Sequence, residues 1–172
     1  MVVICHANVA RSVVAALLLR DAVDERGILL DLRTAGTHAT DGQPASARTA
    51  SALNSVTGAN YPLASHRARQ LRESDVEWAD LIIAMEDSQV RFVRRTHPAA
   101  ADHVGTLTIL ATELPADGRR LADRVAALDL ARREGVGVGD IEDPAGGDDA
   151  AYERAMRVLV ERCDELGRRL AG

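Results

Sequence analysis

The sequence contains no lysine, because all 21 basic residues among its 172 residues are arginines. A chain without lysine cannot form a Schiff base through a side-chain amine. It also lacks the lysine of the G-x-x-x-x-G-K-[ST] nucleotide-binding loop, so both of these enzyme classes are excluded. With 26 acidic residues the formal net charge is −5, which argues against a general nucleic-acid-binding surface.

Aromatic residues make up only 2% of the chain, and cysteine occurs only as Cys5 and Cys163. Two thiols so far apart form no disulfide framework, and no Cys/His cluster has the spacing of a zinc site. We therefore expect neither a metal ion nor a cofactor. No leader pattern precedes the first strand, and no apolar run approaches membrane-spanning length. We expect a reduced, cytoplasmic protein without a membrane or nucleic-acid partner.

The chain has the length of one domain, and strand patterns alternate with helix patterns along it. This alternation predicts a parallel sheet covered by helices on both faces, with an active site at the carboxyl ends of the strands. The expected strands are residues 2–4, 28–33, 80–85 and 107–110, with a turn at 34–37. The expected helices are residues 12–26, 45–56, 88–96, 119–134 and a last one from 148 or 149, with a tether at 135–139 and an N-cap at Ser74.

The first twelve residues carry the strongest chemical signal. A buried strand ends at Ile4 and a helix pattern begins at Ser12, so Cys5 to Arg11 form a tight loop. Such a loop directs successive backbone N–H groups at one point, where the helix N-terminus adds partial positive charge. Arg11 adds a planar fork of donors suited to a tetrahedral oxyanion, and the same field stabilises a thiolate. The pattern predicts that Cys5 is a nucleophile and that an anion binds His6, Ala7, Asn8, Val9, Ala10, Arg11 and Ser12. A structural Cys beside a solvated Arg is the alternative.

A thiolate that attacks phosphorus also needs an acid, because the leaving oxygen must be protonated and a water must later be activated. Asp143 is the best candidate. Pro144 stiffens its loop, and Gly146-Gly147 gives the loop freedom to close. The alternative is an ordinary turn in which an Asp precedes a Pro.

Five sequence blocks then occur in the order of one known family. The first reads Ile4-Cys5-His6-Ala7-Asn8-Val9-Ala10-Arg11-Ser12-Val13, against V-C-x-G-N-x-C-R-S-P. The others are Thr34–Thr37 against S-A-G-T, Ser65–Leu71 against S-H-x-A-R-Q-L, Asp80–Met85 against D-L-I-L-x-M-D, and Asp143-Pro144 against D-P. In these blocks the chain resembles the low-molecular-weight protein tyrosine phosphatase family.

The resemblance implies a single domain over residues 1–172 with a three-layer α/β/α fold. Its four-stranded parallel sheet would be flavodoxin-like (Rossmann-like), in the order 2-1-3-4. It implies a phosphomonoester hydrolase that acts through a phosphocysteine on Cys5, with Arg11 binding phosphate and Asp143 acting as acid and then base. The implied substrate is a phosphorylated protein or a small phosphomonoester. Phosphate, sulfate or another oxyanion would occupy the loop, and the protein would be a monomer or a weak dimer.

The resemblance also implies a supporting network. Ser12 would hydrogen-bond the Cys5 thiolate. Asn8 would hold a left-handed backbone conformation, tied to Ser12, Thr34 and His66, which suits Asn because it tolerates positive φ.

Several positions depart from the family pattern. Ala7 replaces a Gly, which costs about 1 kcal/mol if its φ is positive. Ala10 replaces a second loop Cys, and Cys163 reads as a core residue. The pocket stretches 38–41 and 145–147 lack the family aromatics, and Phe92 and Tyr152 are expected to pack in helices. Phosphate-ester chemistry is therefore better supported than selectivity for tyrosine.

Two alternatives stay open. One is a thiol-dependent arsenate reductase of the same fold, which Asp143-Pro144-Ala145-Gly146 would fit, although Met85-Glu86-Asp87 replaces the expected Met-Gly-Cys. The other is a phosphate- or phosphoprotein-binding module with weak or no catalysis.

Overall fold

A four-stranded parallel sheet forms the centre of the computed structural model, which describes residues 1–133 and 139–172. Its strands are β1 (Val2–Cys5), β2 (Arg33–Gly36), β3 (Ile82–Ala84) and β4 (Val104–Thr106). They lie in the order β2-β1-β3-β4, and every pairing is parallel, which confirms the predicted fold class. Because the strands are parallel, their carboxyl ends share one edge of the sheet.

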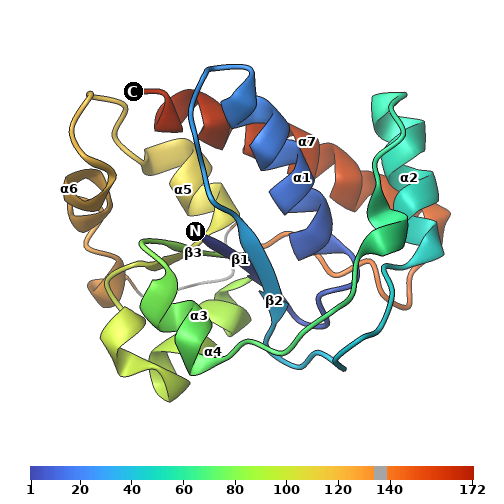
Figure 1. Cartoon of the computed structure of the whole chain (residues 1–172), viewed down its shortest axis with the longest axis horizontal. Helices are drawn as coiled ribbons and strands as arrows, with labels where there is room; N and C mark the ends of the chain where they lie inside the picture. Colours follow the sequence, from blue (N-terminus) through green and yellow to red (C-terminus); the bar gives the residue numbers. More distant parts are fainter. Residues whose placement is uncertain (134–138) are drawn as a thin grey trace.

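Helices cover both faces of this sheet (Figure 1). One face is covered by α1 (Arg11–Asp24), α5 (Leu107–Glu113) and α7 (Asp149–Leu170), and α2 (Ala47–Thr57) packs against α7. The opposite face is covered by α3 (Glu73–Trp78) and α4 (Asp87–Thr96). The helix α6 (Leu121–Ala126) follows α5, and single 3₁₀ turns lie at η1 (Leu63–Ser65), η2 (Pro98–Ala100) and η3 (Leu130–Arg132).

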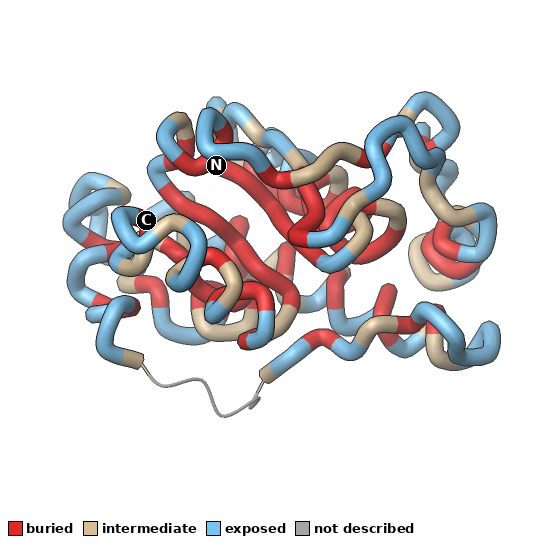
Figure 2. The backbone as a smooth tube through the Cα atoms, turned by 90° about the horizontal axis from the view of Figure 1, so that it is seen from below, coloured by how far each residue is buried: buried red, intermediate tan, exposed pale blue. Residues whose placement is uncertain are grey.

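The alternation of side chains along β1 divides the core in two. Val3 and Cys5 pack with α1, α5 and α7, whereas Val2 and Ile4 pack with α3 and α4. Successive strand residues point to opposite faces, so a strand covered on both faces is apolar throughout. The buried segments accordingly run through the middle of the molecule (Figure 2). Cys5 therefore ends its strand on the side of α1.

The edge strand β2 is fixed against α3. The Arg33 guanidinium carbon lies 3.8 Å from the ring centroid of Trp78, a cation–π contact. Asp75 is buried beside them, with Oδ1 3.8 Å from Nη1 of Arg33 and Oδ2 2.6 Å from Nη1 of Arg69. The two contacts of Arg33 attach the first residue of β2 to the helix that covers it.

The boundaries of β2 and β4 differ from the prediction. The strand expected at 28–33 begins only at Arg33, and Leu29 is 99% exposed. The turn expected at 34–37 is largely this strand. The strand expected at 107–110 is wrong, because these residues begin α5, and the Thr106 hydroxyl accepts a hydrogen bond from the Ile109 N–H as its N-cap.

Two further helix predictions need correction. The helix expected at 119–134 is divided in the described residues into α6 and η3, while residue 134 and most of the 135–139 tether lie outside the described residues. Arg72, not Ser74, precedes the first turn of α3, and its N–H donates to Asp75. The last helix begins at Asp149 with Asp148 as its N-cap, as predicted. No helix in the described ranges is long and apolar enough to cross a membrane.

Candidate active site

The predicted anion cradle lies at the carboxyl end of β1, and we call residues 5–12 the phosphate loop. The Sγ of Cys5 is buried, lies 3.0 Å from the Oγ of Ser12 and accepts the Asn8 N–H at 3.3 Å. The Nδ2 of Asn8 donates to the same Ser12 Oγ at 3.0 Å. Since Ser12 accepts from Asn8, its hydroxyl proton is free to point at Sγ, where it stabilises a thiolate.

Asn8 is the centre of the network in this loop. It is fully buried with φ 57°, and its Oδ1 accepts the Arg69 N–H at 3.0 Å. Its carbonyl accepts from the Nε2 of His66 at 2.7 Å, which fixes the proton of that imidazole on Nε2. The structure thus brings Asn8, Ser12 and His66 together, and Arg69 joins them through its backbone.

Thr34 was expected in this network and lies outside it. It pairs with Val3 in the sheet, two residues before the carboxyl end of β2, whereas Asn8 lies beyond that edge. The backbone N–H of Arg69 supplies the donor to the Asn8 side chain instead. The cost expected at Ala7 does not arise either, because the described non-glycine residues with positive φ are Asn8 and Asp129.

The end of β2 supports the phosphate loop from outside. The N–H groups of Thr37 and His38 donate to the carbonyls of Cys5 and His6, each at 2.9 Å. This approach requires Gly36, because a Cβ there would lie 2.6 Å from the carbonyl oxygen of His6 and 3.0 Å from the nitrogen of Asn8. Gly36 is therefore needed for close packing, with no need for an unusual φ.

The same contact produces an aromatic wall that was not predicted. The rings of His6 and His38 stack with centroids 4.7 Å apart, and the ring of Phe92 lies 5.3 Å from that of His38. The stretches 38–41 and 145–147 contain no Phe, Tyr or Trp, as expected, but Phe92 and the two histidines place aromatic rings beside the first of them. Phe92 does pack from a helix, but it packs against the loop that follows β2.

Arg11 connects the two ends of the chain. It is 1% exposed, and its guanidinium forms ion pairs with Glu86 and Asp143, which is 132 residues away in the sequence. It also donates to the carbonyl of Ile141 at 2.8 Å. A buried guanidinium needs such partners, because removing its charge from water is costly. Sequence reasoning missed Glu86 and Ile141, although Glu86 follows β3 at the sheet edge where Cys5 ends β1.

We call residues 139–148 the acid loop. It is anchored to the sheet by the Ile141 N–H, which donates to the Met85 carbonyl at 2.9 Å. The Asp143 side chain is 37% exposed, and its Oδ1 accepts the Ala145 N–H at 3.0 Å while Oδ2 faces Arg11. A turn follows in which the Gly147 N–H donates to the Pro144 carbonyl at 2.9 Å, with Gly146 at φ 85°. The Asp143 carboxylate thus lies beside the phosphate loop, on the same guanidinium as Glu86.

The second thiol has a different environment. Cys163 lies fully buried on α7, and its Sγ donates to the carbonyl of Ala15 at 3.5 Å. Burial raises the pKa of this thiol well above its usual range. Cys163 is therefore a core residue, as predicted. In residues 1–133 and 139–172, no group of three or more His, Cys, Asp or Glu residues has the arrangement of a metal site.

Residues 1–123 match the family described as low molecular weight phosphotyrosine protein phosphatase. The chain belongs to this family. The matched residues contain the phosphate loop and Glu86, while the acid loop follows them. The resemblance drawn from the five sequence blocks is confirmed, and with it the class of phosphoric monoester hydrolases.

Individual relatives extend over different parts of the chain. A "Probable low molecular weight protein-tyrosine-phosphatase EpsP" from Ralstonia nicotianae is 33% identical over 104 residues, which are 60% of this chain and 67% of the relative. A "Protein-arginine-phosphatase" from Geobacillus stearothermophilus is 28% identical over 167 residues, 97% of this chain and 93% of the relative. The solved structure of a low molecular weight protein tyrosine phosphatase from T. tengcongensis has a TM-score of 0.74 and 27% identity, covering 96% of this chain and 95% of that one.

Proposed function

We propose that this protein removes phosphoryl groups from side chains of phosphorylated proteins through a phosphocysteine on Cys5. The observation that carries the proposal is the contact of Arg11 with Asp143 beside the buried Cys5 thiol. An anion-binding guanidinium, a nucleophile and a carboxyl group are what phosphoryl transfer to sulfur requires. The phosphate loop supplies the guanidinium and the nucleophile, and the acid loop, which is distant in sequence, supplies the carboxyl group at the same edge of the sheet.

In the first step the thiolate of Cys5 attacks phosphorus. The phosphoryl group of the substrate takes the place of Asp143 on Arg11, and Asp143 enters the step protonated. The S–P bond forms as the bond from phosphorus to the leaving oxygen breaks, and Asp143 gives its proton to that oxygen. Arg11 and the backbone N–H groups of the phosphate loop bind the remaining phosphoryl oxygens, where negative charge is concentrated. The ion pair that Arg11 forms with Glu86 keeps the buried guanidinium in place.

In the second step water attacks the phosphocysteine. The Asp143 carboxylate, deprotonated by the first step, accepts the proton of this water as the P–S bond breaks. Cys5 leaves as a thiolate, which the Ser12 hydroxyl and the Asn8 N–H stabilise at the distances described above. Free phosphate is released, and Asp143 is again protonated.

Turnover of 4-nitrophenyl phosphate by wild type, Cys5→Ser and Asp143→Ala tests the mechanism. We expect hydrolysis by wild type, trapping of phosphorylated wild type by rapid acid quench, and loss of turnover in Cys5→Ser. Hydrolysis that survives Cys5→Ser would overturn the proposal. Phosphate binding without hydrolysis would favour the binding module, and arsenate reduction without hydrolysis would favour the reductase.

Phosphotyrosine is the first substrate to test. The wall formed by His6, His38 and Phe92 supports it, because a phenyl ring gains binding energy from an offset or tilted aromatic neighbour. We expect His38→Ala to lower kcat/KM for a phosphotyrosine peptide more than for a small ester without a ring, such as methyl phosphate. An equal loss for both substrates would remove this argument.

Phosphoarginine is a second candidate substrate. The relative that matches 97% of this chain, including the acid loop, is named a protein-arginine-phosphatase. A planar guanidinium stacks on aromatic faces as a phenyl ring does, so the wall fits both groups. Phosphotyrosine, phosphoarginine and phosphoserine peptides of one common sequence should be compared by kcat/KM, which separates the candidates directly.

A further inference from the structure

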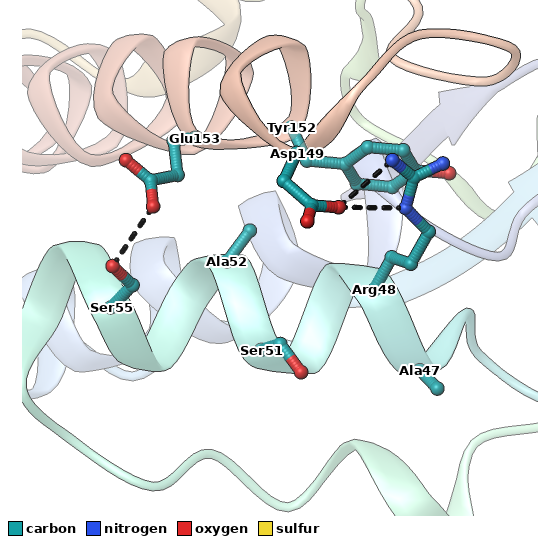
Figure 3. Close-up of a pocket in the computed structure, with 8 residues that line it drawn as sticks. All are labelled: Ala47, Arg48, Ser51, Ala52, Ser55, Asp149, Tyr152 and Glu153. Atoms are coloured by element: carbon teal, nitrogen blue, oxygen red, sulfur yellow. Dashed lines mark hydrogen bonds and ion pairs between the residues drawn. The ribbon is translucent and has the colours of Figure 1, made fainter.

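The helix α2 and the start of α7 face each other across a groove (Figure 3), and the acid loop ends where α7 begins. Two side chains of α2 cross it. Arg48 reaches Asp149 and lies over the ring of Tyr152. At the other end of the groove, the Ser55 hydroxyl donates to Glu153 at 3.1 Å. Only the first of these crossings touches the acid loop.

Arg48 contacts the acid loop and the start of α7 through every part of its guanidinium. Nη1 donates to the carbonyl of Gly147 at 3.0 Å. Nε and Nη2 donate to Oδ1 of Asp149 at 3.1 and 2.9 Å, and the guanidinium carbon lies 4.7 Å from the Tyr152 ring centroid. The planar fork of an arginine is suited to several directed contacts of this kind at once.

The segment that carries Arg48 is itself bound to the phosphate loop. The N–H of Ser46, the residue before α2, donates to the carbonyl of Val9 at 2.9 Å. Arg48 lies two residues further on. The start of α2 therefore holds the phosphate loop through its backbone and the end of the acid loop through a side chain.

The link from Gly147 to Asp143 is short. Gly147 closes the turn that begins at Pro144, directly after Asp143, and a Cβ on Gly147 would lie 2.7 Å from the Cβ of Ala151. The turn is thus packed closely on α7. Because this turn is short and closed, a shift of the Gly147 carbonyl would also displace Asp143 at its other end.

We propose that Arg48 is a positioning residue, which fixes the end of the acid loop so that Asp143 faces the leaving group. This inference rests on the proposed role of Asp143 as general acid. Arg48 is expected to position the acid loop and not to stabilise the fold, because the side chains of Arg48 and Asp149 are 45% and 91% exposed. Exposed ion pairs contribute little to the free energy of unfolding. A displaced acid, by contrast, lowers the rate steeply.

The test compares kcat/KM for 4-nitrophenyl phosphate and phenyl phosphate, because a less acidic leaving group depends more on protonation. In Arg48→Ala we expect kcat/KM to fall about tenfold for phenyl phosphate and about twofold for 4-nitrophenyl phosphate. The melting temperature should change little. Arg48→Lys should recover part of the loss, because an ammonium can reach one partner but cannot replace the fork.

Ser55→Ala is the matched control, since it removes the other crossing of the groove without touching the acid loop. It should leave both kcat/KM values unchanged. Equal losses for the two esters in Arg48→Ala, or the same selective loss in Ser55→Ala, would overturn the positioning role.

Asp143→Ala separates this inference from the proposed function. If Asp143→Ala shows the selective loss and Arg48→Ala does not, only the role of Arg48 is wrong. If Asp143→Ala lowers both values equally, the assignment of the general acid is wrong, and the role of Arg48 falls with it.

Discussion

The phosphate loop and the acid loop meet at Arg11 but are held in opposite ways. The phosphate loop joins a buried strand to a buried helix turn, and Cys5, Asn8, Arg11 and Ser12 are each at most 3% exposed. The acid loop runs over the surface, with Asp143 37% exposed. Contacts from separate elements hold it, namely Arg11 of α1, Arg48 of α2, the backbone of Met85 after β3 and Thr108 of α5.

This difference separates binding from proton transfer. The phosphate loop is part of the folding core, so its geometry exists before substrate arrives and costs no reorganisation. Beyond the buried Ile141, the exposed part of the acid loop is held by a few contacts that contribute little to stability, so its position is adjustable. Substitutions in the first loop should therefore cost both stability and activity, and substitutions of the exposed residues of the second should mainly cost activity.

Asn8→Ala should have the largest effect. It removes the donor to Ser12 and the acceptor of Arg69, and it places Ala at positive φ, so we expect a loss of about 3 kcal/mol in the free energy of unfolding. Activity should fall more than ~10²-fold, because Ser12 is no longer oriented toward Sγ. Urea denaturation and kcat/KM measure both. Asn8→Asp keeps the acceptor, so its stability and activity should lie between those of wild type and Asn8→Ala. An Asn8→Ala variant with the stability and activity of wild type would contradict the network.

Asp143→Asn tests the other loop. We expect kcat/KM for phenyl phosphate to fall about 10²-fold, because the amide cannot protonate the leaving oxygen. The free energy of unfolding should change by less than about 1 kcal/mol, because Arg11 keeps Glu86 and the Ile141 carbonyl as partners. Asp148→Asn is the matched control in the same loop, since Asn also caps helices well. A comparable loss of activity in Asp148→Asn would show that the effect is not specific to Asp143, and the contrast drawn between the two loops would then fail.

Gly36→Ala should displace the phosphate loop from the end of β2. The added Cβ would meet backbone atoms of His6 and Asn8, and backbone cannot move aside cheaply, so we expect a loss of about 2 kcal/mol in the free energy of unfolding. Activity should fall about tenfold because the anion site is distorted. Gly105→Ala, where the Cβ meets only leucine side chains at 3.3 Å or more, should be nearly silent in activity.

The smallest effect concerns pH and Cys163. Burial raises the pKa of this thiol, so the folded protein keeps a proton that the unfolded chain releases above the ordinary thiol pKa of 9.0. The free energy of unfolding should therefore fall as pH rises above that value, by at most about 1.4 kcal/mol per pH unit. Cys163→Ala should have a shallower slope between pH ~9 and pH ~10. Equal slopes would show that this thiol does not remain protonated in the folded state.

The phosphate loop could be predicted from sequence because its signals are local. A β-branched run, a short loop and an apolar helix follow one another within twenty residues, and the elements form where the pattern puts them. The acid could be proposed from Asp143-Pro144, but the contacts that hold its loop could not. Glu86 and the Ile141 carbonyl contact Arg11, and Arg48 contacts the Gly147 carbonyl, and only the folded topology joins these distant positions.

The errors in β2 and β4 have a related cause. The strand β2 contains Thr, Ala and Gly after an Arg, which is a weak strand pattern, and it forms because β1 pairs with it. Residues 107–110 are apolar enough for a buried strand, yet Leu107, Leu110, Ala111 and Leu114 have the spacing of a helix face. That spacing, with Thr106 as N-cap, was the signal that could have corrected the prediction.

The contact of Arg33 with Trp78 gives the molecule a built-in spectroscopic reporter. Trp78 is the only tryptophan of the chain, so its fluorescence comes from one place, the edge where α3 meets β2. The opposite end of that strand is Gly36, which touches the phosphate loop. An oxyanion bound at the loop changes the Trp78 emission only if β2 moves as one piece. A titration with phosphate or sulfate therefore measures whether the edge strand transmits binding through the molecule.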